Sequence, residues 1–164
     1  MFLGFLTATA SLIYIVENLL LRALPVPFLR LGLANIVLLY LVWHRKLWQA
    51  YLVTVAKTMI GGIATFTILS PGVLLSLGGG IIAVSVMSLG LLMRPRFSIT
   101  GISILGAVSH NLTQLILARW LIIASDSLFV LTPILILFGL FSGIVTAYIC
   151  YYIEERIPAL KAKI

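Results

Sequence analysis

Three hydrogen-bonding side chains, His110, Asn111 and Gln114, lie within five consecutive positions of an otherwise apolar run. At about 100° of rotation per residue, they share roughly a third of a helix circumference with the small residues Ser103 and Ala107. An imidazole and two carboxamides can donate to and accept from a small polar ligand. The same stripe can serve helix packing, because polar side chains also bond across neighbouring helices. We favour ligand contact, since these three groups together exceed what packing requires.

A lysine, Lys57, lies near the middle of another apolar run, on one face with small and hydroxyl-bearing residues. A charge at the centre of a bilayer is costly, so this amine must be neutral, paired, or facing water or an anionic ligand. An ion pair with Glu17, the one acid inside any run, and contact with a ligand both stay open, and the two are compatible. The residues that share its face are Thr54, Thr58, Gly61 and Thr65.

A third polar group surrounds the Pro-rich segment at 23–29. With Lys57, it places an excess of positive charge at one end of the protein, and electropositive clefts concentrate anions. We therefore predict a ligand that carries a phosphate or a carboxylate. Arg119 is a weaker member of this set, because it lies off the His110–Gln114 stripe and could instead reach lipid headgroups. The group itself comprises Glu17, Asn18, Arg22, Arg30 and Asn35.

These side chains must be positioned by membrane helices, because apolar runs fill almost the whole chain. Hydrophobic residues make up 62% of the 164 positions and charged residues 9%, and the mean hydropathy is +1.23. A soluble fold of this size could not bury so much apolar surface. A span takes about 20 helical residues, and the sequence predicts six runs, at about 2–22, 32–43, 47–69, 72–93, 98–123 and 128–152.

The second run is too short to span a bilayer alone. We expect residues 23–31 to form an ordered loop that dips into the protein, because irregular backbone is tolerated at membrane depth when protein buries it. Alternatively, the second helix begins near Val26 and covers 26–43, with Arg30 in its first turn. Under either alternative, we predict that residues 1–164 form one transmembrane domain. It is a six-transmembrane-helix bundle with a short tail at 153–164.

Basic residues in short loops predict the orientation of this bundle. The turns at 44–46 and 94–96 and the tail are basic, whereas the turns at 70–72 and 125–127 carry no basic residue. With six spans, the basic segments fall on one side, so we predict that both termini are cytoplasmic. The net charge of +7 largely reflects this loop bias and does not indicate nucleic-acid binding.

The residues that most enzymes need are scarce. The chain has one cysteine and four acids, of which only Glu17 lies in a run. It offers no Asp-rich pair for Mg²⁺ and no phosphate-binding Gly-x-x-x-x-Gly-Lys motif, so we predict no metal, no cofactor and no catalysis. Small residues instead predict close helix packing, at Gly78–Gly80, along Gly139, Ser142, Gly143 and Thr146, and on the face formed by Gly4, Ala8 and Ser11.

Four segments, taken in order, resemble one bacterial membrane family. They are Glu17 before the Pro-rich loop, then 32–37 (GLANIV), 76–80 (SLGGG) and 106–114 (GAVSHNLTQ). The family is labelled either "Gx transporter" or "heptaprenyl diphosphate synthase component I", and the likeness covers most of residues 10–120. This family is similar to the substrate-binding S components of energy-coupling factor (ECF) importers, which are six-helix proteins of the bacterial inner membrane with cytoplasmic termini.

This resemblance implies that the chain is the substrate-binding subunit of such an importer. It would capture a small anionic molecule, such as a vitamin or an isoprenoid or quinone precursor, and work with a transmembrane coupling subunit and two ATPase subunits. S components dock through Ala-x-x-x-Ala on the first helix, where this chain has Gly4-x-x-x-Ala8. The alternative is a non-catalytic membrane component of heptaprenyl diphosphate synthase. The resemblance places Glu17, Asn35, His110, Asn111 and Gln114 at the ligand, beside Lys57 and Arg30 from the charge argument.

Overall fold

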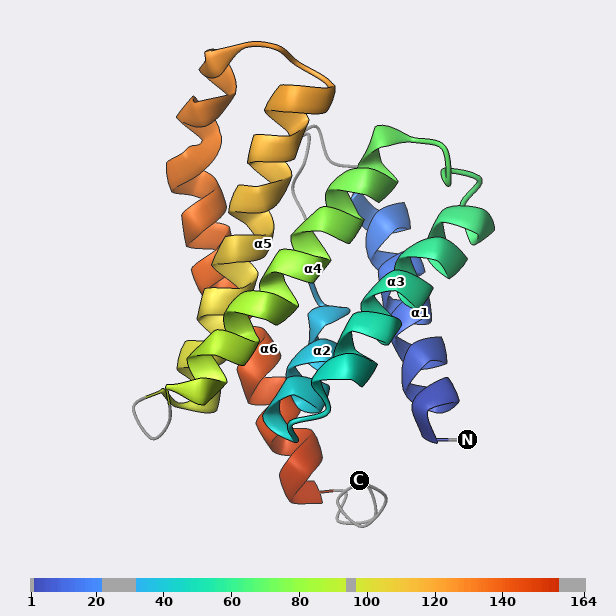
Figure 1. Cartoon of the computed structure of the whole chain (residues 1–164), viewed down its shortest axis with the longest axis vertical. Coiled ribbons are helices and arrows are strands. Elements are labelled where there is room, and N and C mark those ends of the chain that lie inside the picture. The colour runs from blue at the N-terminus through green and yellow to red at the C-terminus, as the bar shows by residue number, and fades with distance from the viewer. Residues whose placement is uncertain (1, 22–31, 94–96, 157–164) are drawn as a thin grey trace.

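The computed structural model describes residues 2–21, 32–93 and 97–156, and within them the chain is a bundle of six α-helices and one 3₁₀ helix (Figure 1). The predicted all-helical class is confirmed. The elements are α1 (Phe2–Leu21), α2 (Asn35–Trp43), α3 (Leu47–Ala64), α4 (Pro71–Leu92), α5 (Ile99–Leu121), η1 (Asp126–Leu131) and α6 (Thr132–Arg156).

Four stretches are long and apolar enough to cross a membrane, so the chain is a membrane protein. They lie in α1, α4, α5 and the η1–α6 unit. The described residues form the six helices that the sequence predicts, and four of the described stretches have the length and hydropathy of a span. The count of six spans stays a prediction. α3 is less apolar, since its sequence includes Gln49 and Lys57, and α2 has nine residues.

The first, fourth and fifth helices closely match the predicted runs, whereas α3 ends at Ala64, well before residue 69. After Ala64 the chain turns: Phe66 has a left-handed backbone with φ of 55°. The Thr67 amide donates to the Gly62 carbonyl at 2.8 Å. Such a bond closes the last turn of a helix and satisfies a carbonyl that the helix leaves open. At the other end of the chain, α6 continues to Arg156, into the predicted tail.

α2 begins at Asn35, so a continuous second helix that starts near Val26 is wrong. Gly32 has a positive φ of 68°, a conformation that glycine adopts without steric cost. A turn follows, in which the Asn35 amide donates to the Gly32 carbonyl at 2.8 Å. This turn sets the start of α2. The predicted inward loop at 23–31, together with Arg22 and Arg30, lies outside the described residues.

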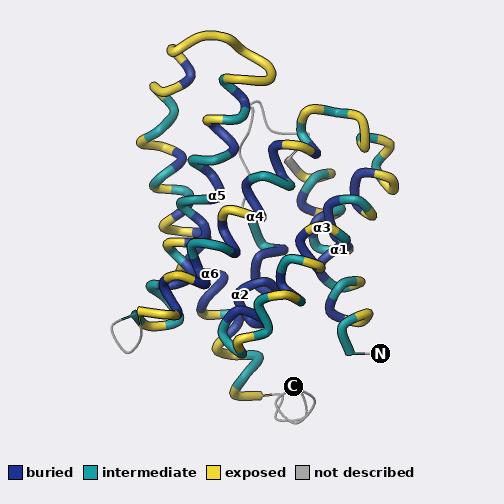
Figure 2. Tube along the Cα trace, in the orientation of Figure 1, coloured by how far each residue is buried: buried dark blue, intermediate teal, exposed yellow. Residues whose placement is uncertain are grey.

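The short helix α2 is the centre of the bundle. It contacts α1, α3, α4, α5 and α6, and every residue from Asn35 to Val42 is buried. Figure 2 shows α2 as an almost continuous dark segment, whereas the long helices around it alternate between buried and exposed faces. A helix that is apolar on all sides is stable only when it is enclosed. The all-round apolar sequence of α2 therefore explains its central position.

The glycine run in α4 packs that helix against neighbours on both sides. A Cβ atom at Gly80 would stand 2.6 Å from Cγ2 of Thr54 in α3. A Cβ atom at Gly78 would stand 2.5 Å from Cδ1 of Leu117 in α5. A side chain at Gly80 would collide with Thr54, and one at Gly78 would require Leu117 to move, so the predicted close packing is confirmed here.

α5 and α6 also meet through small residues. A Cβ atom at Gly143 would lie 2.7 Å from Cα of Ile104, and one at Gly139 would lie 2.9 Å from Cα of Val108. The Ser103 hydroxyl donates to the Gly143 carbonyl at 2.7 Å. The predicted small-residue stripe on the sixth helix is thus a packing surface against α5.

The start of α1 and the end of α6 lie at the same end of the bundle, together with the α2–α3 turn (Figure 1). We call this the terminal end. Exposed tryptophans lie near both ends: Trp48 in the first turn of α3 at the terminal end, and Trp120 near the end of α5 at the opposite end. Each is 74% exposed. Tryptophan is enriched where a membrane meets water, so the pair is consistent with a bilayer between these two levels.

Candidate functional site

Glu17 is buried in α1 and accepts a hydrogen bond from the backbone of the segment before α2. The Gly32 amide donates to its Oε1 at an N···O distance of 2.5 Å. A buried carboxylate is stable only when it is hydrogen-bonded or paired, and backbone amides are suitable donors to it. This contact ties α1 to the left-handed turn that sets the start of α2.

Lys57 and Asn35 form the next link. The Lys57 amine donates to Oδ1 of Asn35 at 3.1 Å, and both side chains are buried. Asn35 is also close to Gly32, because a Cβ atom there would stand 3.0 Å from its Nδ2. The structure thus brings three predicted residues, Glu17, Asn35 and Lys57, into one group around Gly32. Within this group Glu17 bonds to Gly32 and Lys57 to Asn35, while the predicted Glu17–Lys57 ion pair stays a prediction.

Charges of both signs meet in this group. Asn35 is the first residue of α2, and Ala34 before it provides no side-chain cap. The first turn of a helix carries a partial positive charge, and helix N-termini bind phosphates and carboxylates. Lys57 adds a buried amine next to this helix end. The buried Glu17 carboxyl group, which accepts from the Gly32 amide, provides the opposite charge in the same group.

His110 and Gln114 form a second polar group, on α5 against α4. A Cβ atom at Gly79 would stand 3.1 Å from Nδ1 of His110 and 3.1 Å from Cγ of Gln114. Glycine at 79 therefore lets α4 approach these two side chains. Gln114 is 1% exposed, and neither polar atom of its amide has a hydrogen-bond partner among the described residues. Buried amides are normally hydrogen-bonded, so Gln114 is a candidate for ligand contact.

Asn111 faces a different neighbour from Gln114. Its Nδ2 donates to the Leu135 carbonyl of α6 at 3.1 Å. This hydrogen bond joins α5 to α6, so Asn111 contributes to the packing of these two helices. Of the three amide and imidazole residues that the sequence grouped together, the structure places His110 and Gln114 against Gly79 and directs Asn111 to α6.

Of the predicted arginines, Arg22 and Arg30 lie outside the described residues. Arg119 is at the end of α5, where its Nε lies 2.6 Å from Oδ1 of Asp126, and its guanidinium stacks 5.6 Å from the Trp120 ring centroid. Arg119 thus binds the carboxylate of Asp126, the first residue of η1. Neither Gly32 nor Gly79 was predicted as a partner of a site residue, although both stood inside the motifs that carried the resemblance.

A family model for heptaprenyl diphosphate synthase component I matches residues 6–153. The chain belongs to this family. In this component I protein the match includes every described residue of both polar groups. Comparisons with curated proteins and with solved structures gave no match. Among the described residues of this family member, no three His, Cys, Asp or Glu side chains gather where they could hold a metal ion.

Proposed function

We propose that this protein is a non-catalytic membrane subunit that binds a small anionic molecule inside its helical bundle, in the manner of an S component of an ECF importer. The observation that carries the proposal is the buried Lys57 amine, held by Asn35 at the start of the interior helix α2. A buried amine beside the positive end of a helix attracts an anion. We infer that a carboxylate or phosphate group of the ligand binds there.

The second polar group adds specificity to this site. The amide of Gln114 can both donate and accept, and its two polar atoms have no partner among the described residues. Burying such a group without partners costs about 1–3 kcal/mol. A ligand that hydrogen-bonds to Gln114 recovers this cost. α4 lies between the two groups, with Gly80 against Thr54 and Gly79 against His110 and Gln114.

The importer proposal includes an orientation and partners. The chain would lie in a bacterial inner membrane with the terminal end in the cytoplasm. The basic residues Arg45 and Lys46 follow α2 at that end, which agrees with the excess of basic residues in cytoplasmic loops. A transmembrane coupling subunit and two ATPase subunits would complete the importer, because neither the sequence nor the described site offers a nucleotide-binding motif.

Affinity purification of the tagged protein from its native membranes in mild detergent, followed by mass spectrometry, tests the partners. Recovery of two ATPases and a transmembrane coupling subunit supports the importer. Recovery of a soluble prenyl diphosphate synthase without ATPases contradicts it and favours the second function given below.

The binding site is tested by mass spectrometry of small molecules released from the purified protein. The wild type should release an anionic compound that Lys57→Met does not retain. Lys46→Met, which removes a lysine from the α2–α3 turn, is the matched control and should retain it. Equal retention by both variants would contradict a role for Lys57 in anion binding.

The family match favours a second function, a membrane component of a prenyl diphosphate synthase. In this role the protein would hold an isoprenoid substrate or product at the bilayer for a soluble catalytic partner. That partner would be cytoplasmic and would approach the terminal end of the bundle. Co-purification of a prenyl synthase, with synthase activity that depends on the membrane protein, would support this function over the importer.

A further inference from the structure

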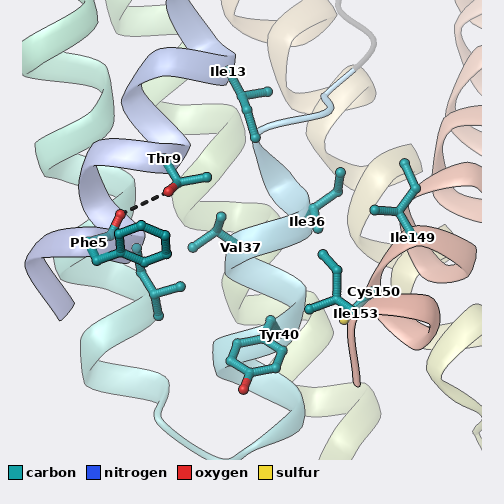
Figure 3. A pocket seen from close by; sticks show the side chains of 10 residues that line it. Phe5, Thr9, Ile13, Ile36, Val37, Tyr40, Ile149, Cys150 and Ile153 are labelled. Carbon is teal, nitrogen blue, oxygen red and sulfur yellow. Dashed lines mark hydrogen bonds between the residues drawn. The ribbon is translucent and has the colours of Figure 1, made fainter. Parts of the chain in front are cut away.

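Apolar side chains are exposed on the long helices and also on one connection between helices. On the helices this is expected, because a span meets lipid; a cleft of about 220 Å³ between α1, α2 and α6, lined mostly by apolar residues, is an example (Figure 3). The connection is the α3–α4 turn, residues 65–70. In this turn Phe66 is 96% and Leu69 97% exposed, more than any other large hydrophobic side chain among the described residues. Exposed apolar groups gathered in one place indicate an interaction surface.

The polar groups of the α3–α4 turn bond within the turn and to the end of α3. The Thr65 hydroxyl donates to the Gly61 carbonyl at 2.8 Å and lies 2.8 Å from the Thr67 hydroxyl. The Thr67 amide donates to the Gly62 carbonyl, and the Ser70 amide to the Thr67 carbonyl, each at 2.8 Å. Backbone groups in lipid must find such internal partners, because lipid offers none. The turn thus keeps polar groups inside and apolar side chains outside, the reverse of what water favours.

The backbone of this turn holds Phe66 in an unusual conformation. Its φ is 55°, in the left-handed region that glycine adopts without steric cost and aromatic residues rarely adopt. A Cβ atom at Gly62 would stand 3.2 Å from Cα of Ile68, so the turn folds back closely onto the end of α3. Local backbone preference therefore does not account for an aromatic residue at position 66. An apolar environment around its side chain does.

Charge is absent around this turn and present in the other connection at the same end. Residues 58–93 contain no charged residue, whereas Arg119 and Asp126 form an ion pair across the connection between α5 and η1. Figure 1 shows that the α5–η1 connection reaches farther from the terminal end than the α3–α4 turn does. The charged connection is thus the one that projects, and the apolar turn lies at a lower level.

The length of α3 also places the turn below the membrane surface. Trp48 and Ala64 are sixteen residues apart in α3, which is about 24 Å along a straight helix. The hydrocarbon core of a bilayer is about 30 Å thick. With Trp48 at the interface near the terminal end, α3 ends before the opposite interface. The slant of α3 relative to the long axis of the bundle in Figure 1 shortens its reach further.

We propose that the α3–α4 turn is embedded in the bilayer, where Phe66 and Leu69 contact the acyl chains of membrane lipids. The contact is in the leaflet opposite the terminal end. It fixes the depth of α3, the helix that carries Lys57, because withdrawing the turn into water would expose both side chains. This surface is independent of the ligand and of the partners proposed above.

Spin-label accessibility in vesicles of phosphatidylethanolamine and phosphatidylglycerol tests the proposal. A nitroxide is attached to Phe66→Cys or Leu69→Cys in the full-length protein, with Cys150→Ala as the background because Cys150 is the one cysteine of the chain. We expect collisions with oxygen, which concentrates in lipid, and loss of collisions with a water-soluble nickel chelate. Ser127→Cys is the matched control, because Ser127 is exposed at the same end of the bundle. Its label should collide with nickel.

Two results would overturn the proposal. Nickel collisions at positions 66 and 69 equal to those at 127 would place the turn in water. Protection from both nickel and oxygen would mean that protein and not lipid covers the turn. The wild type gives a second measurement if the cysteine variants do not fold. In vesicles that contain phosphatidylcholine with a diazirine on an acyl chain, the peptide with residues 65–70 should be labelled; labelling of helices without this peptide would contradict lipid contact.

Discussion

The amine of Lys57 donates a hydrogen bond of 3.1 Å to Oδ1 of Asn35. This contact joins the middle of α3 to the first residue of α2, and both side chains are buried. A cation, a helix start and an amide thereby meet inside a membrane protein. The bond serves the fold and is part of the anion site that we propose, and the two roles can be separated experimentally.

We expect Asn35→Leu to lower the free energy of unfolding by about 1.5–3 kcal/mol, because the buried amine of Lys57 loses a charge-assisted hydrogen bond. Lys57→Met in the same background should recover part of this loss, because it removes the buried charge itself. Denaturant unfolding of the four proteins of this double-mutant cycle in detergent measures the coupling. Strictly additive effects would contradict the pairing. Asn18→Leu, at a half-buried amide on α1, controls for loss of an amide.

Gln114→Leu and Asn111→Leu should have opposite effects. Gln114→Leu removes two buried polar atoms without partners, so the unfolding free energy should stay the same or rise, while ligand retention is lost. Asn111→Leu removes the bond to the Leu135 carbonyl and should cost about 0.5–2 kcal/mol, with ligand retention kept. Thermal unfolding and the released-ligand assay on both variants test this contrast. If Asn111→Leu lost the ligand and Gln114→Leu kept it, Asn111 and not Gln114 would be the residue that binds the ligand.

Gly79→Ala should be harmful to the site. The added Cβ would stand 3.1 Å from atoms of both His110 and Gln114, so these side chains must shift, and overpacking typically costs about 1–3 kcal/mol. We expect weaker ligand retention and lower thermal stability. Gly4→Ala is the matched control, because no atom lies within 4 Å of a Cβ at that position. That substitution should be neutral or stabilise α1 by up to about 1 kcal/mol.

Gly32→Ala tests the turn before α2. The positive φ of 68° costs a residue with a side chain about 1–2 kcal/mol, and the new Cβ would also approach Nδ2 of Asn35. We expect lower stability and a weaker site, because the turn orients both Asn35 and the amide that binds Glu17. Gly101→Ala, where the nearest contact of a Cβ is 3.4 Å, is the comparison. Equal melting temperatures for the two variants would contradict the role of the turn.

Substitution of the Arg119–Asp126 pair should have little effect. Its atoms are 2.6 Å apart, but the Asp126 side chain is largely exposed, and exposed ion pairs contribute about 0–1 kcal/mol. We expect Asp126→Asn to leave ligand retention unchanged and to shift the melting temperature slightly, with a smaller shift at high salt. Loss of the ligand in this variant would indicate that Arg119 contributes to ligand binding.

Much of the fold could be predicted because a bilayer imposes simple rules. Long apolar runs had to be helices, since lipid offers no partner for free backbone groups, and α1, α4 and α5 closely match the predicted ranges. The exceptions are local. α3 ends at Ala64, shortly before the left-handed residue Phe66, and the start of α2 is set by the turn at Gly32. Neither feature produces a change in hydropathy.

The site was only partly predictable. Polar residues inside apolar runs predicted a site at Glu17, Asn35, Lys57, His110 and Gln114, and all five are buried in the structure. A helical wheel also placed Asn111 with Gln114, since it describes one helix without its neighbours. In the structure, Asn111 donates to the Leu135 carbonyl of α6, whereas Gln114 lies against α4. The cleft between α1, α2 and α6 left no signal in the sequence, because its walls have the same apolar composition as the packed core.

The sequence by itself determined that this is an all-helical membrane protein with ionisable and amide groups inside its apolar runs, since composition and hydropathy depend only on residue type. The tertiary structure decided that α2 is the centre of the bundle, that Lys57 meets Asn35 at its start, and that α1 and α6 stay apart over a cleft. These relations join residues far apart in the chain. They depend on how helices pack, and packing is set by the shapes of neighbouring surfaces, which no single segment specifies.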